Sequence, residues 1–182
     1  MFGPREVLTA AHCQWNKRTL NWLVPDSVNF LAGYRRGEFM AHDKVVDYTL
    51  GDPLVTLNDG GRFRPHDWAT LHLAEPIDDV TVTVTLGLSS TPVQEYIQAG
   101  YSKDEPHILT IDEGCPVDDT RNTGGLLFHG CDAVGGDSGS PILGISGDAL
   151  VVHGVHVATC VGGGGDSLEI AIPIDSVADG LN

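Results

Sequence analysis

The sequence is poor in positive charge, and this scarcity limits the partners that the protein can have. Its 182 residues include 10 Lys and Arg against 25 Asp and Glu, which gives a formal net charge of −15. Nucleic acids and anionic membrane surfaces attract proteins through basic residues. We therefore expect neither of them as a partner.

Other signals are missing too. No stretch reaches the ~18 consecutive apolar residues of a membrane span. The N-terminus has no basic segment followed by an apolar stretch, so a secretory signal is absent. None of the four cysteines stands in a C-x-x-C pair, and the histidines and carboxylates show no ligand-like spacing, so we expect no metal site. Four cysteines nevertheless suggest disulfides and an oxidising compartment.

Short β-type segments make up most of the chain. Examples are SVNFLAGY (27–34), KVVDYTL (44–50) and ALVVHGVHV (149–157), and Gly, Pro, Asp and Asn separate such segments. This spacing is typical of an antiparallel barrel or sandwich. Only residues 174–180 are compatible with a helical turn or two. Residues 74–92 resemble a crossing between two halves, so the sequence predicts an all-β fold in two parts.

The most specific string is GGDSGSP, at residues 135–141. A serine flanked by glycines suits a nucleophile, because small neighbours let the backbone approach a substrate carbonyl and direct N–H groups toward it. A glycine-rich turn without any chemistry has a similar composition. The string alone leaves both interpretations open.

Two further motifs precede this string, LTAAHC and HDWATLHL. In this order the three motifs resemble those of the trypsin/chymotrypsin family of serine peptidases, over nearly the whole chain. The resemblance implies a catalytic triad in the order His, Asp, Ser. His12 is then the general base, Asp67 the carboxylate that orients it, and Ser138 the nucleophile. The N–H groups of Gly136 and Ser138 would form the oxyanion hole.

The resemblance also implies an architecture. It predicts two antiparallel six-stranded β-barrels with the active site between them, the first incomplete at its N-terminus. Residues 1–85 would form the first barrel, with His12 and Asp67, and residues 86–182 the second, with Ser138. The triad needs no cofactor, the substrates would be polypeptides, and the protein would be a monomer.

Two positions predict opposite preferences for the residue before the scissile bond. In trypsin-like members the residue six before the nucleophile lies at the base of the specificity pocket, and Asp132 there would favour Lys or Arg. GCDAVGGDSGSP, however, looks closer to the bacterial glutamyl-endopeptidase-like branch, in which a histidine on the pocket wall binds a substrate Glu. His156, with Thr159 nearby, is the candidate. The specificity stays open at this point.

The same branch implies a disulfide between Cys115 and Cys131. In the family Cys13 pairs with a cysteine upstream, which this chain does not contain, and Cys160 has no evident partner.

Family members carry strands of the first barrel upstream of the LTAAHC motif, whereas this chain begins at MFGPREV. We therefore expect a truncated product or a mis-called start, and a secreted or periplasmic protein whose signal peptide lies upstream. In many members a freed N-terminal amine pairs with the Asp before the nucleophile. Here that residue is Asp137, which needs another partner. The alternatives are a non-catalytic relative that binds partners through the cleft, and an inactive fragment.

Overall fold

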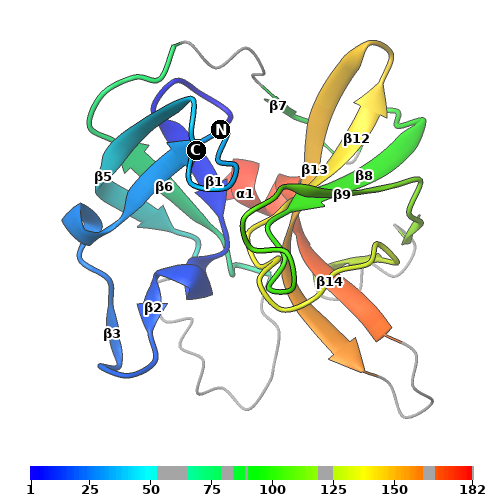
Figure 1. The fold of residues 1–182 in the computed structure, drawn as a ribbon. Coiled ribbons are helices and arrows are strands. Elements are labelled where there is room, and N and C mark those ends of the chain that lie inside the picture. The colour runs from blue at the N-terminus through cyan, green and yellow to red at the C-terminus, as the bar shows by residue number, and fades with distance from the viewer. Residues whose placement is uncertain (53–64, 79–83, 89, 119–124, 162–166, 182) are drawn as a thin grey trace.

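The structure of the chain is a computed structural model that describes residues 1–52, 65–78, 84–88, 90–118, 125–161 and 167–181. Two curled antiparallel sheets lie side by side, and a short C-terminal helix, α1 (Ile174–Gly180), lies between them (Figure 1). The all-β prediction is confirmed. None of the described helices is long and apolar enough to cross a membrane.

The first sheet has four strands in the order β1-β6-β5-β4. Its bounds are β1 (Glu6–Thr9), β4 (Asn29–Ala32), β5 (Ala41–Leu50) and β6 (Ala69–Leu73). Buried residues of three strands and the following loop form its core: Val7, Val45, Leu71, Leu73 and Ile77. The connection from β1 to β4 contains two 3-10 turns, η1 (Ala11–Gln14) and η2 (Pro25–Ser27), and a small hairpin of β2 (Trp15–Asn16) and β3 (Asn21–Trp22).

The second sheet has eight strands, seven of them in the order β10-β11-β14-β13-β12-β8-β9. Its bounds are β7 (Thr85–Leu86), β8 (Glu95–Gly100), β9 (Thr110–Glu113), β10 (Val117–Asp118), β11 (Leu127–His129), β12 (Pro141–Ser146), β13 (Ala149–Val161) and β14 (Ser167–Pro173). The strand counts among the described residues thus differ from six per barrel. In the second sheet the excess comes from β7 and β10, which have two residues each. The predicted division at residues 85 and 86 falls inside β7, which pairs in parallel with β13.

The largest core cluster joins the two parts of the chain. Trp68, which is 1% exposed, packs with Ala10 and with Ile172, Ile174 and Val177 from β14 and α1. A side chain at Gly180 would collide with the Trp68 ring, since an added Cβ would lie 2.4 Å from Cζ2. The residues next to the predicted His12 and Asp67 are therefore anchored in a core shared with the second sheet.

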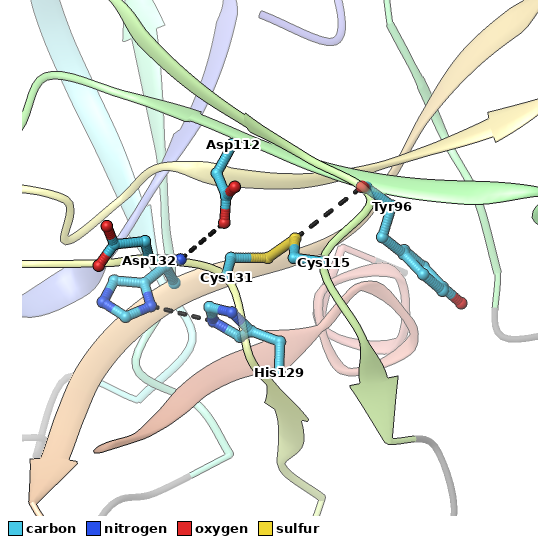
Figure 2. The surroundings of a disulfide bond; sticks show 7 residues. Tyr96, Asp112, Cys115, His129, Cys131 and Asp132 are labelled. Atoms are coloured by element: carbon cyan, nitrogen blue, oxygen red, sulfur yellow. Dashed lines mark hydrogen bonds between the residues drawn. A yellow bond between two sulfur atoms is a disulfide. The ribbon is translucent and has the colours of Figure 1, made fainter. Parts of the chain in front are cut away.

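A disulfide joins Cys115 and Cys131, 16 residues apart, as the resemblance implied (Figure 2). Both cysteines are buried against Leu127, Ile142 and Ala171. Cys13 and Cys160 are free.

We expect the double variant Cys115→Ser/Cys131→Ser to lower the free energy of unfolding by about 3 kcal/mol. The cause is that a loop of this length no longer restricts the unfolded chain. Urea denaturation of the two proteins measures the difference. The variant Cys160→Ser is the control, and an equal loss of stability there would contradict the assignment to the bridge.

Candidate active site

His12 and Asp67 are held together by two hydrogen bonds. The His12 ring donates from Nδ1 to Asp67 Oδ2 at 2.8 Å, since a carboxylate oxygen only accepts, and the His12 backbone N–H donates to Asp67 Oδ1 at 2.9 Å. Each side chain is 16% exposed. The pair is therefore fixed in orientation and still reaches solvent.

The strand register explains why residues 55 positions apart meet. β1 and β6 are antiparallel neighbours, with Thr9 opposite Ala69 at the end of the ladder. His12 follows β1 and Asp67 precedes β6, so both lie beyond the same edge of the sheet. The buried Ala10 and Trp68 hold the two segments in place.

The surroundings of His12 favour its charged form. Burial alone lowers its pKa, but the hydrogen bond to the Asp67 carboxylate and its negative charge, together with the neighbouring Cys13 side chain, outweigh burial and raise the pKa to about 10. A site of this kind stabilises an imidazolium at the moment when the ring has accepted a proton.

Ser138 lies in a tight turn against the segment that carries His12. An added Cβ at Gly139, whose φ is 91°, would lie 2.4 Å from Thr9 Oγ1, so the turn approaches β1 as closely as a glycine permits. The Cys13 thiol donates to the Ser138 carbonyl oxygen at 3.5 Å. Among the hydrogen bonds of the described residues, none joins Ser138 Oγ to His12. Such contacts are often loose in a free enzyme and tighten with substrate.

Asp137 has a different partner from the amine found in many family members. It is 2% exposed, and its carboxylate accepts from Ser102 Oγ at 2.9 and 3.0 Å and from the Val134 N–H at 2.9 Å. These bonds hold the loop before Ser138 to the end of β8. Ser102 could not be recognised from the sequence, because its contact with Asp137 spans 35 residues.

Gly136 allows this loop to turn. Its φ is 111°, and an added Cβ would lie 2.7 Å from the Lys103 backbone nitrogen. Among the described residues, neither the Gly136 N–H nor the Ser138 N–H donates to a backbone carbonyl. Both groups therefore remain available to a ligand oxygen.

The three residues that were predicted to determine specificity are not hydrogen-bonded to one another, and each has a different partner. His156, on β13, is 2% exposed, and its Nδ1 lies 3.1 Å from Nε2 of the buried His129. Thr159 donates to the buried Glu169 at 2.5 Å. Asp132 is exposed, and its backbone N–H donates to Asp112 at 2.7 Å.

His129 and Glu169 are additional polar residues in this region. His129 on β11 lies directly opposite Glu169 on β14. Burial, and then repulsion from His156, lower the pKa of His129 to about 3. Burial also lowers the pKa of His156, to about 4, although Asp137 acts against it. Burial raises the pKa of Glu169. Strand register rather than sequence spacing brings these groups together.

We expect the free energy of unfolding to fall as the pH is lowered from about 6.5 to about 4. In this range histidines of the unfolded chain bind protons, while His129 and His156 in the folded chain stay neutral, at a cost of roughly 1.4 kcal/mol per pH unit for each. Urea midpoints measured across this range in wild type and His129→Gln provide the test. The loss should be smaller in His129→Gln and unchanged in His42→Gln, a variant of an exposed histidine. Equal slopes in all three proteins would contradict the assignment.

Comparison with known proteins supports the fold. No protein-family model matches the sequence, and no curated protein matches it at a significant level. Among solved structures, the crystal structure of a thermostable serine protease, AL20, from an extremophilic microorganism is similar, with a TM-score of 0.70 and 16% sequence identity. The match covers 98% of this chain and 83% of that chain. Together with the two curled sheets, it shows a chymotrypsin-type double β-barrel.

Proposed function

We propose that this chain is a serine endopeptidase that cleaves polypeptides through His12, Asp67 and Ser138. The observation that carries the proposal is the His12–Asp67 pair, which is joined by two hydrogen bonds. The pair lies beside the turn of Ser138, where the two sheets meet. The arrangement combines the segments after β1 and before β6 of the first sheet with the segment before β12 of the second sheet.

The chemistry follows from the geometry. Ser138 Oγ attacks the peptide carbonyl carbon while His12 Nε2 accepts the hydroxyl proton, because a neutral hydroxyl is a poor nucleophile without a base. Asp67 keeps the proton of the ring on Nδ1 and stabilises the imidazolium. The carbonyl oxygen becomes an oxyanion, to which the N–H groups of Gly136 and Ser138 donate.

The tetrahedral intermediate then breaks down. The C–N bond cleaves, His12 returns its proton to the leaving amine, and the acyl group stays on Ser138. Water attacks this ester with His12 again as base, which releases the acid and restores the serine. His12 only relays protons, Ser138 and the attacking water supply the nucleophilic electron pairs, and the step needs no other reactant, so we propose no cofactor.

Several finer predictions join this proposal. The Cys115–Cys131 bridge supports a secreted or periplasmic location, because disulfides persist in oxidising compartments. Membership of the glutamyl-endopeptidase-like branch and a monomeric state stay predictions. The two specificity predictions also remain predictions: cleavage after basic residues, through Asp132, and cleavage after Glu, through His156 and Thr159. A peptide library in which the residue before the scissile bond is varied distinguishes them.

Labelling with a fluorophosphonate probe tests the proposed function. The probe forms a covalent bond with an activated serine, so we expect labelling of the chain and none of Ser138→Ala. A folded chain that is never labelled would favour the non-catalytic alternative, in which the same cleft binds partners.

A further inference from the structure

An open pocket lies where a hairpin of the first sheet meets a loop of the second. Its volume is about 320 Å³, and it is lined by Tyr34, Arg36 and Gly37, from the hairpin between β4 and β5, and by His107, from the loop between β8 and β9. None of these described lining residues is an Asp or Glu, although the chain contains 25 of them. The lining therefore combines a positive charge with polar aromatic groups and has no acidic group of its own.

Several contacts fix the hairpin to the loop. The Tyr101 hydroxyl donates to the Tyr34 carbonyl oxygen at 2.6 Å, and the Arg36 backbone N–H donates to the His107 carbonyl oxygen at 2.8 Å. The Tyr34 ring also contacts the rings of Tyr101 and His107, with centroids 6.0 and 6.1 Å apart. The pocket is thus formed before any ligand arrives, which lowers the entropic cost of binding.

Arg36 occupies an unusual backbone conformation in this pocket. Its φ is 50° and that of Gly37 is 92°, so the two form a tight turn of the left-handed type. Gly, Asn and Asp are the usual residues at such positions, and an arginine there is uncommon. The bond to the His107 carbonyl keeps Arg36 in place, its side chain is exposed, and among the described residues its guanidinium forms no ion pair.

Tyr34 and His107 together provide a hydrogen-bond donor. The Tyr34 hydroxyl oxygen lies 2.8 Å from His107 Nδ1. If the hydroxyl donates, the neutral ring carries its proton on Nε2, and if Nδ1 donates, the hydroxyl hydrogen is free. In either arrangement one hydrogen remains for a ligand. Protonation of the ring would add positive charge to the same side of the pocket.

We propose that this pocket binds a tetrahedral oxyanion, a phosphate or sulfate group. A guanidinium pairs with two oxygens of an oxyanion at once. It thereby engages both oxygens of a carboxylate, whereas a tetrahedral oxyanion has a further oxygen on another side, which can accept from the Tyr34–His107 pair. The ligand would contact both the hairpin and the loop and so tie the two sheets together. The site is separate from the triad and does not depend on the proposed function.

Calorimetric titration of the chain with inorganic phosphate tests the site. We expect saturable binding that Arg36→Gln weakens about tenfold, because charge-assisted hydrogen bonds are lost. The double variant Tyr34→Phe/His107→Phe keeps both rings and removes the donor, and it should weaken binding about fivefold. Arg18→Gln changes the charge equally at another exposed arginine and should leave the affinity unchanged.

Thermal unfolding provides a second measurement. Phosphate at a fixed concentration should raise the thermal midpoint more in wild type than in Arg36→Gln, because only specific binding to the folded chain differs between the two proteins. General effects of the salt on apolar burial act on both equally. The midpoints without phosphate show whether each variant is folded.

Three results would overturn the proposal. They are the absence of saturable binding, an equal loss of affinity in Arg18→Gln and Arg36→Gln, and binding of acetate as tight as that of phosphate, which would show a carboxylate site instead. An acetylated, amidated Gly-phosphoserine-Gly peptide, titrated into Ser138→Ala so that it is not cleaved, then identifies the source. Binding of the peptide supports a phosphorylated polypeptide as the ligand, and binding of inorganic phosphate alone supports the free ion.

Discussion

Ser138→Ala is expected to lower kcat/KM for a peptide substrate by about a millionfold, the loss typical of removing a triad nucleophile. The methyl group cannot attack the carbonyl, while the fold should be retained, because the hydrogen bonds of this turn come from backbone groups and from Asp137. Hydrolysis of a fluorogenic peptide mixture measures the effect.

The control for this experiment is Ser146→Ala, at the far end of β12, which should keep full activity. Thermal unfolding of all three proteins separates lost chemistry from lost structure. If Ser138→Ala retained more than a few per cent of the activity, the nucleophile would be another group. Cys13 would be the first to test, because its exposed thiol lies against His12 and Ser138.

The pairing of His12 with Asp67 could be predicted from the resemblance, because the motifs that carry it are local stretches of the sequence. LTAAHC and HDWATLHL place a histidine after one strand and an aspartate before another, and the strands pair where the apolar residues require it. The bridge between Cys115 and Cys131 was implied by the resemblance to the family branch, and the structure confirms it.

The surroundings of the site could not be predicted in this way. The bond from Ser102 to Asp137 and the contact of His129 with His156 join residues 35 and 27 positions apart, on segments whose relative position depends on register. A shift of one residue would turn His129 or His156 to the other face of its strand. Sequence spacing does not specify such contacts, and the sequence therefore left Asp132 and His156 as competing predictions.

Asp67→Asn is expected to lower kcat at neutral pH by about ten-thousandfold. Asn keeps an oxygen for the backbone N–H of His12, so the segment should stay in place. Its NH₂ group, however, faces Nδ1 of the ring and favours the tautomer with the proton on Nε2. That nitrogen then cannot accept the proton of Ser138.

The pH profile gives this variant a signature that a structural defect would not produce. Asp67 is among the groups that raise the pKa of His12 to about 10, so its removal lowers that pKa. His12 acts as base only when neutral, and activity therefore rises with pH as the ring loses its proton. We expect the acidic limb of the kcat/KM profile to move to lower pH in Asp67→Asn and to stay in place in Asp26→Asn, a variant of an exposed aspartate. An unchanged limb together with unchanged kcat would show that Asp67 does not act on His12, because both effects require the contact between the carboxylate and Nδ1.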